Sequence, residues 1–597
     1  MVTIQNLISQ PPEVDTSTDL LIRYHACKAM AKGYAEKNTS EQVRLEHARS
    51  FCALVVQSFW AALCNKYKSK LKIKPYKHGL LNLAVDVRVL AEEIGTLISI
   101  FPAEDSGYLI GSIYTAMLPS SLRSEMGAFY TPPPLVNRLL DQIEAAGFDY
   151  SIGSAIDPAC GGGAFLAPLA MRMIRHEEGT SPELILRQLS KRLKGIELDP
   201  FAAWMSTVLL ESAVLPICIA AKSRMADVII VGDALQLNNI GLYDLVVGNP
   251  PYGRVKLDDQ MRRKYSRSLY GHANLYGLFT DLALQLVNTS GILAYLTPTS
   301  FLGGQYYKAL RKLLTDEMTP VSFDFIADRD GVFDDVLQET MLTTYIKSSS
   351  SRSAQVSVVI PQGLNEARVD HITSVRVNGQ GDPWLLPRDP QNAIFLNNII
   401  NMPTRISALG YTVATGQLVW NRHKEQLTSV IENDSLPLIW AESVTINGFQ
   451  FSANKRNHVP YINVKNNQAH LVTRNSVVLL QRTTSKEQNR RLLAAELPQK
   501  FIDEHGGAVI ENHLNLVYSP SGIRPKVSLS TICLLLNTET VDRAFRCISG
   551  SVAVSAYEIN ALPLPSIEQL VELEEYIKNG ASKISAEKRI ASFYGVE

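Results

Sequence analysis

The sequence predicts an α/β protein that is built around a mostly parallel sheet in the middle of the chain. Over residues 126–347, short apolar runs typical of strands alternate with longer runs typical of helices. Several apolar runs end on a carboxylate or an amide, and ligands bind at such strand ends in open parallel sheets. The composition is that of a globular protein, because 46% of the 597 residues are hydrophobic and 19% are charged.

The central region is expected to alternate strand and helix from its first glycine-rich loop onward. The expected strands, in chain order, are SAIDPAC (154–160), RLKGIELDP (192–200), MADVIIVGDAL (225–235), YDLVVGNPPY (243–252), GILAYLTPTSF (291–301), VSFDFIAD (321–328) and ETMLTTYIK (339–347). The expected helices are GAFLAPLAMRMIRH (163–176), FAAWMSTVLLESAVL (201–215), ANLYGLFTDLALQLV (273–287) and QYYKALRKLLTDE (305–317). Such alternation implies a sheet that is covered on both faces.

Two further regions flank this one. Residues 1–125 repeat apolar side chains at helical spacing, with Ser40 placed to cap a long helix, and they are expected to form a helical region packed on its neighbour. A serine-rich break at 348–354 precedes a stretch of strands and polar loops. We therefore expect three domains: a helical region (1–125), a catalytic domain (126–360) and a mixed α/β target-recognition domain (361–597).

Charge and cysteine content exclude several classes of protein. The net charge is +0, so any footprint for nucleic acid must be local. The seven cysteines form no C-x-x-C pair, which favours reduced thiols over a disulfide framework or a zinc site. No basic and apolar leader or long apolar run stands out, so we expect a cytoplasmic, nucleoid-associated protein of a bacterium or archaeon, with no membrane partner and no metal.

The first strand runs into a loop that suits a cofactor. Glycines after Asp157 let the backbone turn tightly and approach a ligand, and no Gly-Lys-Ser/Thr follows, so this is not a Walker A loop. A carboxylate here suits a cofactor with positive charge, such as the ammonium or sulfonium group of S-adenosylmethionine. The candidate residues are Asp157, Ala159, Gly161 and Gly163. Alone, the glycine cluster is equally compatible with a structural turn.

Two more carboxylates end the next strands. Glu197 can accept both ribose hydroxyls, as acidic residues do in dinucleotide folds. Asp233 can accept from an adenine amino group. A single Asp in a loop is usually a cap or turn residue. Three acidic strand ends in succession, however, favour a cofactor that contains a nucleoside.

The fourth strand stops at Gly248 and continues as Asn249-Pro-Pro-Tyr252. The prolines cannot donate to a sheet ladder, so a rigid loop presents one amide and one ring. The Asn249 oxygen and the Pro250 carbonyl can accept both hydrogens of an exocyclic amine, which turns the nitrogen lone pair toward an electrophilic methyl group. Tyr252 can stack on the base. A purely structural turn is the alternative for this tetrapeptide alone.

In their order, these segments resemble the motifs of the γ-class, TaqI-like adenine-N6 DNA methyltransferases of type II restriction–modification systems. The resemblance covers about residues 125–347. It begins with GAFYTPPPLVNRLL (127–140), includes DPACGGGAF, GIELDP, VGDAL and NPPYG, and continues through NLYGLF and GILAYLTPTSFL. The segment GVFDDVLQETMLTTYI (331–346) is the loosest match.

The resemblance implies a Rossmann-like class I methyltransferase sheet, S-adenosylmethionine as cofactor and double-stranded DNA as substrate. It implies that Tyr130 and Thr131 contact the cofactor, as Asn249 also does, and that Phe333 faces Tyr252 across a flipped-out adenine; a core phenylalanine is the alternative. Flipping costs a few kcal/mol, offset by stacking. Transfer is then direct, without a covalent enzyme intermediate. No Pro-Cys dipeptide of a cytosine-C5 enzyme occurs, and we interpret Cys160 as a small hydrophobe.

Two basic segments are expected to contact DNA. Residues 451–500 contain nine Lys or Arg and two Glu, a local charge of +7. RVKLDDQMRRKYSRS (254–268) directly follows the NPPYG motif. With LVWNRHKE (418–425), they give the predicted DNA-binding residues Arg254, Lys256, Arg262, Arg263, Arg422, Arg482, Lys486 and Arg490. A solvated basic face is the alternative for the first segment.

We therefore expect a stand-alone, site-specific adenine-N6 DNA methyltransferase, acting as a monomer beside a separately encoded restriction endonuclease. The N-terminal region shows no D…E-x-K nuclease constellation, so cleavage is not expected. One alternative is an N-methyltransferase for RNA or a protein amide, since such enzymes also use N-P-P-Y. The other is a catalytically idle DNA-binding subunit, against which the intact motifs count.

Overall fold

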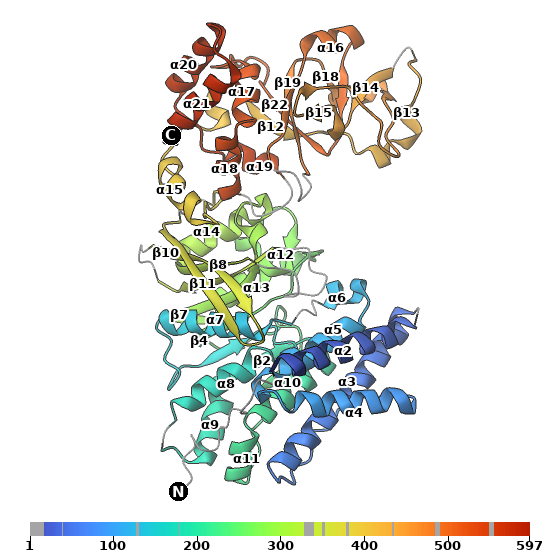
Figure 1. Ribbon diagram of the computed structural model, residues 1–597, viewed down its shortest axis with the longest axis vertical. Coiled ribbons are helices and arrows are strands. Elements are labelled where there is room, and N and C mark those ends of the chain that lie inside the picture. The colour runs from blue at the N-terminus through green and yellow to red at the C-terminus, as the bar shows by residue number, and fades with distance from the viewer. Residues whose placement is uncertain are drawn as a thin grey trace. The chain divides into compact units, whose positions relative to one another are not determined.

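The computed structural model of the chain (Figure 1) describes residues 17–38, 40–126, 130–177, 179–327, 339–348, 353–377, 381–432, 435–483, 490–548 and 554–596. The chain divides into two compact units. The first unit comprises Met1–Pro298 and Leu313–Arg376, and the second comprises Thr299–Lys312 and Val377–Glu597. Each unit has its own sheets and its own buried clusters.

A nine-stranded sheet organises the first unit, in the order β11-β10-β8-β9-β7-β4-β1-β2-β3. The parallel part consists of β1 (Ala155–Asp157), β2 (Leu193–Glu197), β3 (Ile229–Val231), β4 (Tyr243–Gly248) and β7 (Val287–Pro298). After β3 the chain returns to place β4 on the other side of β1. The strand order therefore reverses between β1 and β4, and ligands bind at such a switch point in open α/β sheets.

The remaining strands extend the sheet beyond β7. There β9 (Thr340–Ile346) runs antiparallel to both β7 and β8 (Thr319–Ile326). The hairpin of β10 (Ala354–Gln362) and β11 (Glu366–Val375) completes this edge, and β10 runs parallel to β8. The predicted mostly parallel α/β sheet is thus confirmed. The β10-β11 hairpin belongs to this sheet, and it includes position 360, where the catalytic domain is predicted to end. The division into three domains stays a prediction.

Helices between the strands begin where the sequence supplies a cap. Side chains of Ser181, Asp199 and Asn274 accept backbone N–H groups at the starts of α9 (Pro182–Arg192), α10 (Pro200–Ala213) and α13 (Leu275–Leu286). The other helices of this part are α7 (Pro133–Ala145), α8 (Leu166–Arg175), α11 (Leu215–Ala221), α12 (Asp259–Lys264) and α14 (Lys308–Glu317). Apolar side chains of α7, α8, α9, α10 and α11 pack with the sheet into one buried cluster.

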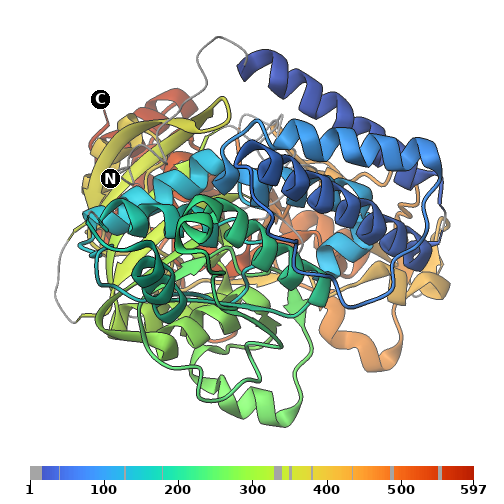
Figure 2. The same ribbon diagram turned by 90° about the horizontal axis from the view of Figure 1, so that it is seen from below.

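The N-terminal helices share a core with α10. They are α2 (Ser17–Glu36), α3 (Glu41–Lys66), α4 (Val85–Ile98), α5 (Ser106–Met117) and α6 (Ser120–Met126), and Figure 2 shows the blue helices running side by side. Phe201 and Trp204 of α10 lie in the same apolar cluster as α3, α4 and α5. Ser40 precedes α3 as predicted, but its side chain makes no capping hydrogen bond.

None of the helices in the described ranges combines the length and apolarity that a bilayer crossing requires. The pair α10 and α11 passes that test together only by length and composition, and the two helices meet at an angle of 67°. Most side chains of α10 are buried in the first unit. The pair is therefore explained as core helices.

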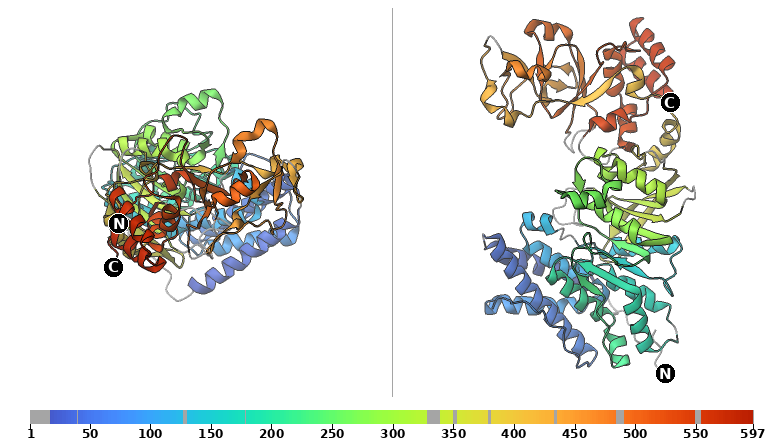
Figure 3. Two further views of the ribbon diagram at one scale, coloured as in Figure 1. Left: turned by 90° about the horizontal axis from the view of Figure 1, so that it is seen from above. Right: turned by 180° about the vertical axis from the view of Figure 1, so that it is seen from behind.

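The second unit contains two larger sheets and several helices, and Figure 3 shows the red C-terminal helices gathered at one end of this unit. One sheet has the order β12 (Thr412–Thr415), β22 (Leu514–Tyr518), β19 (Val477–Gln481) and β20 (Ala494–Leu497). The other has the order β13 (Leu427–Thr428), β17 (Tyr461–Asn463), β14 (Ser435–Ile439), β21 (Ala508–Ile510) and β18 (Val472–Thr473). The helices are α15 (Pro390–Ile399), α16 (Gln499–His505), α17 (Leu529–Leu536), α18 (Glu539–Ile548), α19 (Ala556–Asn560), α20 (Ile567–Lys578) and α21 (Lys583–Phe593).

Candidate active site

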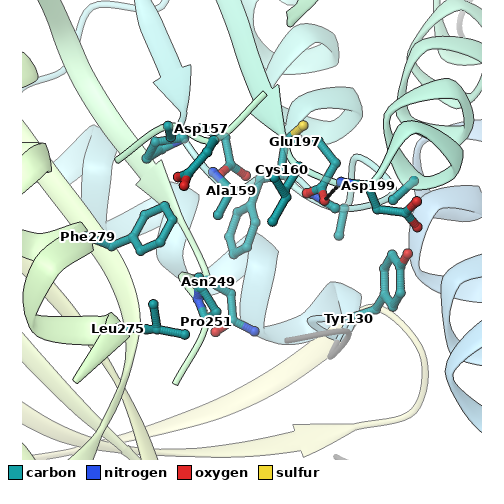
Figure 4. A pocket seen from close by; sticks show the side chains of 18 of the residues that line it. Tyr130, Asp157, Ala159, Cys160, Glu197, Asp199, Asn249, Pro251, Leu275 and Phe279 are labelled. Atoms are coloured by element: carbon teal, nitrogen blue, oxygen red, sulfur yellow. Dashed lines mark hydrogen bonds between the residues drawn. The ribbon is translucent and has the colours of Figure 1, made fainter. Parts of the chain in front are cut away.

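A cavity of about 220 Å³ lies at the carboxyl ends of β1, β2 and β4, where the strand order reverses. Figure 4 shows side chains from these strand ends facing it. The predicted cofactor residues that line it are Tyr130, Thr131, Asp157, Ala159, Gly161, Glu197, Asp233 and Asn249. Gly163 lies outside the lining, in the turn below, where a Cβ would come within 2.8 Å of Ser206 Oγ.

The carboxylate of Asp157 is buried at the end of β1, with an exposed fraction of 1%. Its Oδ1 accepts the backbone N–H of Ala159 at 3.0 Å. Burial raises the pKa of Asp157 to about 8, a shift that the hydrogen bond from Ala159 opposes and the nearby charge of Glu197 reinforces. This carboxyl is therefore protonated at neutral pH until a positive charge comes close to it.

The carboxylate of Glu197 is held by two backbone donors. The N–H of Gly161 donates to Oε2 at 2.8 Å, and the N–H of Asp199 donates to Oε1 at 2.9 Å. Burial raises the pKa of Glu197, while these two hydrogen bonds oppose the shift. Each carboxylate oxygen retains capacity for a second hydrogen bond. The side chain is thus fixed in orientation and still able to accept hydroxyl groups.

Asp233 lies after β3 and caps the turn that follows it. Its Oδ1 accepts the N–H of Leu235 at 2.9 Å, and its Oδ2 accepts Gln236 Nε2 at 2.7 Å. This is the turn role that a single aspartate commonly has. Its place in the cavity lining nevertheless brings it to the same site as the other two carboxylates.

The amide of Asn249 is oriented by partners on either side. Its Nδ2 donates to Thr131 Oγ1 at 3.2 Å, and its Oδ1 accepts the hydroxyl of Tyr252 at 2.8 Å. The same hydroxyl lies 3.1 Å from the carbonyl oxygen of Leu296. The Tyr252 ring meets Tyr276 edge-on at 6.5 Å between centroids. Because the amide nitrogen of Asn249 donates to Thr131, the amide oxygen of Asn249 points away from Thr131.

Backbone geometry at the end of β4 requires glycine. Gly248 has φ +154°, and a Cβ at this position would lie 2.6 Å from Asp157 Oδ1. The strand ending that presents Asn249 is therefore packed directly on the carboxyl at the end of β1. Pro250 is buried, and Pro251 lines the cavity. The four-residue loop is rigid both by sequence and by contact.

Several lining residues were missed by the sequence analysis. Leu275 and Phe279 of α13 lie on the side of Asp157, whereas Asp199 lies near Tyr130 (Figure 4). The first two belong to the NLYGLF segment, and Asp199 belongs to GIELDP, so each lies within a quoted motif. Tyr114 of α5 also lines the cavity. No motif marks Tyr114, because it comes from the region in which no site was expected.

Cys160 also lines the cavity, and its side chain is buried. Burial raises the pKa of the Cys160 thiol well above its usual range. The nearby charges of Asp157 and Glu197 raise this pKa further. Its Sγ accepts the Ser206 hydroxyl at 3.7 Å. A thiol that resists ionisation is a poor nucleophile. This environment agrees with the interpretation of Cys160 as a small apolar residue.

The predicted DNA-binding residues differ in their exposure to solvent and in whether they form hydrogen bonds within the protein. Those with exposed side chains are Arg254, Lys256, Arg262, Arg263, Arg422 and Arg490. Arg490 Nη1 donates to Asn537 O at 2.6 Å, and half-buried Arg482 donates to Asn512 O at 2.7 Å. Lys486 and Phe333 lie outside the described residues, so their predicted roles stay predictions.

Two other residues of the basic run after NPPYG are used inside the fold. Lys264 Nζ donates to the carbonyl oxygen of Leu235 at 2.7 Å, beside the cavity. Arg267 pairs with buried Asp281 at 2.6 Å and with Glu317 at 2.7 Å. These contacts attach the loop to the body of the first unit. Arg262 of the same run also donates to the carbonyl oxygen of Gly271 at 3.3 Å.

Comparisons with known proteins find similarity to restriction–modification methyltransferases. The model of the Eco57I restriction-modification methylase family matches residues 218–333. The type II methyltransferase M.BsuBI of Bacillus subtilis is 22% identical over 479 residues, which are 76% of this chain and 90% of the relative. The type II methyltransferase M.PstI of Providencia stuartii is 26% identical over 350 residues, which are 57% of this chain and 68% of the relative.

A solved structure supports the fold over nearly the whole chain. It is that of the type IIL restriction-modification enzyme MmeI in complex with DNA. It aligns over 99% of this chain and 97% of its own, with a TM-score of 0.53 and 14% sequence identity. At that identity the likeness concerns the arrangement of the elements alone.

Proposed function

We propose that this chain, a DNA methyltransferase of the restriction–modification type that uses S-adenosylmethionine, modifies N6 of an adenine turned out of duplex DNA. The observation that carries the proposal is the orientation of the Asn249 amide. Its nitrogen donates to Thr131, and Asn249 lines the cavity that the three carboxylates share. An amide held in this way would offer its oxygen to an exocyclic amine.

The residues of the chain would act by position and electrostatics. The Asn249 oxygen and the Pro250 carbonyl would accept the two N6 hydrogens and so orient the nitrogen lone pair. Tyr252 would stack on the flipped base, supported by the edge of Tyr276. Phe333 is proposed for the opposite face of the base. Holding two reactants in line is worth several orders of magnitude in rate, without any covalent intermediate.

The chemistry of the cavity fits the cofactor. When bound, S-adenosylmethionine supplies an electrophilic methyl group on a sulfonium centre. Asp157 would balance its positive charge, Glu197 would accept ribose hydroxyls and Asp233 would accept the adenine amine. The glycines of the loop leave room for backbone contact, since Gly161 has φ +52° and carries no Cβ. Tyr130, whose ring lies against Gly162 of the loop, and Thr131 would complete the wall of the site.

Methyl transfer to a defined base tests the proposal. The protein is incubated with methyl-labelled S-adenosylmethionine and DNA from a host that lacks the modification, and the nucleosides are separated after digestion. We expect the label on N6-methyl-2′-deoxyadenosine. Label on N4-methylcytosine, on RNA or on protein would contradict the adenine assignment. No label on any of them would favour an idle DNA-binding subunit.

The second unit and the loop after NPPYG are proposed as the DNA-binding surfaces, with Arg422, Arg482, Lys486 and Arg490 in the former. Basic side chains in both are where phosphate contacts are expected. We also propose that the enzyme acts as a monomer and that a separate chain supplies the cognate endonuclease. Size-exclusion chromatography with light scattering, in the presence of a duplex, tests the first of these statements.

The basic loop gives a measurable dependence on salt. In the double variant Lys256→Ala/Arg263→Ala, we expect the slope of log Kd against log salt for duplex DNA to fall by about 2, since each phosphate contact contributes about one unit. Affinity should fall alike for all sequences, because phosphates carry no sequence information. Fluorescence anisotropy at several salt concentrations measures the slope. Arg368→Ala, an exposed arginine of β11, is the matched control and should leave it unchanged.

Asp157 should couple cofactor binding to pH. Its pKa of about 8 means that the carboxyl carries a proton at pH 7, and a cationic cofactor favours the carboxylate. Binding at pH 7 should therefore release about one proton, and affinity should rise with pH up to about 8 and then level off. Calorimetry in buffers of different ionisation enthalpy measures the proton. Asp157→Asn should release none, whereas Asp244→Asn at the start of β4 should behave as the wild type.

The same pKa sets the sign of the effect on the ligand-free protein. The folded state keeps a proton that the unfolded state loses above its pKa of 3.8, so the unfolded state binds fewer protons between these values. The free energy of unfolding contributed by this group therefore decreases as pH rises from about 4 to about 8. In the calorimetric experiment on cofactor binding, an enthalpy that does not depend on the buffer would show that Asp157 is already ionised before the cofactor binds.

A further inference from the structure

A chain of hydrogen bonds connects the N-terminal helices to the candidate ribose acceptor. Arg49 of α3 donates through Nη2 to Asp199 Oδ1 at 2.8 Å. The backbone N–H of Asp199 donates to Glu197 Oε1 at 2.9 Å, and Gly161 holds the other oxygen at 2.8 Å. The Asp199 side chain is 12% exposed and that of Arg49 is 28% exposed, so the pair is shielded in a way that surface pairs are not.

Asp199 has two tasks in this chain of bonds. The same Oδ1 that meets Arg49 accepts the N–H of Phe201 at 3.1 Å and so caps α10. Its main chain fixes Glu197. Without the guanidinium, Asp199 would keep the cap but lose the charge partner that determines where its carboxylate sits. A movement of Asp199 would reach Glu197 directly, because only one residue separates them.

A second contact joins the same helical region to the glycine loop. A Cβ on Gly107 of α5 would lie 3.2 Å from Ala164 N, and one on Gly111 would lie 2.2 Å from the ring of Tyr130. The backbone of α5 therefore lies against both the loop and a residue of the cavity wall. Tyr114 of the same helix lines the cavity. The N-terminal helices thus reach the site through two elements, α3 and α5.

We propose that the N-terminal helices are part of the cofactor site and that Arg49 is a positioning residue, which holds the ribose-binding carboxylate of Glu197 through Asp199. The inference rests on the proposed function, in which Glu197 accepts the ribose hydroxyls. It assigns to residues 17–126 a role in cofactor affinity in addition to packing. Arg49 itself touches Asp199 and need not touch the cofactor.

Binding of S-adenosylhomocysteine to the full chain, measured by calorimetry without DNA, tests the proposal. Arg49→Met should raise Kd about tenfold, and Arg49→Lys, which keeps the charge, should recover most of the affinity. In an Asp199→Ser background, where serine still caps α10, Arg49→Met should have no further effect. An equal effect in both backgrounds would show that Arg49 acts through the fold and would overturn the proposal.

A cofactor analogue separates positioning from general destabilisation. The wild type should prefer S-adenosylhomocysteine to its 2′,3′-dideoxy analogue, and Arg49→Met should lose most of this preference because the hydrogen bond from Asp199 to Glu197 is no longer held in place. A loss of affinity for both ligands by the same factor would overturn the proposal. If Arg49→Met does not fold, Arg49→Gln can replace it, because glutamine is neutral but retains a hydrogen-bond donor. The ratio of the Kd values for the two ligands is then measured with that variant.

The control is a matched pair in the same unit. Arg172 of α8 pairs with Asp141 of α7 at 2.6 Å, and neither lines the cavity. Arg172→Met should keep the wild-type preference between the two ligands. A wild type without any preference would contradict the role of Glu197 in the proposed function, whereas a preference that persists in Arg49→Met would contradict only the inference made here.

Discussion

Replacing Asn249 with alanine should lower the rate of methyl transfer about 10²–10³-fold, with S-adenosylmethionine still bound. The change removes the oxygen that is proposed to accept the target amine, and it leaves the carboxylates of the cavity in place. The amide is held by Thr131 at 3.2 Å and Tyr252 at 2.8 Å, so its orientation exists before substrate arrives. Single-turnover transfer to duplex DNA, at saturating cofactor, measures the loss.

A control of the same type lies in the same sheet. Asn288 of β7 donates to Asp244 Oδ1 at 2.9 Å and does not line the cavity. Asn288→Ala should retain nearly full single-turnover activity. If Asn249→Ala abolished cofactor binding or folding as well, the residue would be a structural element of the loop, and the transfer assay alone would not separate the two roles.

Gly248→Ala should lower the free energy of unfolding by about 3 kcal/mol and abolish cofactor binding. A Cβ would lie 2.6 Å from Asp157 Oδ1, and the residue has φ +154°. Both the strained backbone and the collision with a buried carboxyl contribute to the cost. Thermal and denaturant unfolding of the ligand-free protein, together with calorimetry, measure the two effects.

Gly253 provides the comparison that separates these contributions. It has φ +113°, but a Cβ there would meet nothing within 4 Å. Gly253→Ala should therefore cost only the conformational part, about 1 kcal/mol. If the two substitutions destabilised the protein equally, the contact between the end of β4 and Asp157 would not be the cause.

The sequence was sufficient to predict the central sheet and the set of residues at its strand ends. Asp157, Glu197, Asp233 and Asn249 each follow an apolar strand, and parallel strands bring their carboxyl ends to one edge. The resemblance to restriction–modification methyltransferases is confirmed by the family model and the relatives. The γ-class assignment, the adenine specificity and the role of each site residue stay predictions.

Contacts between distant segments could not be predicted in this way. Arg49 and Asp199 are 150 residues apart, and no periodicity pairs them. The position of β9 between β7 and β8 is equally invisible in a linear pattern, because an antiparallel strand has the same apolar run as a parallel one. The internal contacts of Lys264 and Arg267 could not be read from the basic run either, because their partners Leu235 and Asp281 lie in other segments.

The hydroxyl of Tyr252 has a consequence for selectivity. It lies within hydrogen-bond reach of both Asn249 Oδ1 and Leu296 O, at 2.8 Å and 3.1 Å. When an incoming amine donates to the Asn249 oxygen, the Tyr252 hydroxyl can therefore turn and donate to the Leu296 carbonyl oxygen instead. The total number of hydrogen bonds then does not fall. A base with a carbonyl in place of the amine offers no donor in exchange and faces an acceptor that is already in use. In the ligand-free protein the Tyr252 hydroxyl therefore occupies the oxygen that the substrate needs. Only an amine can replace this hydroxyl without a net loss of hydrogen bonds.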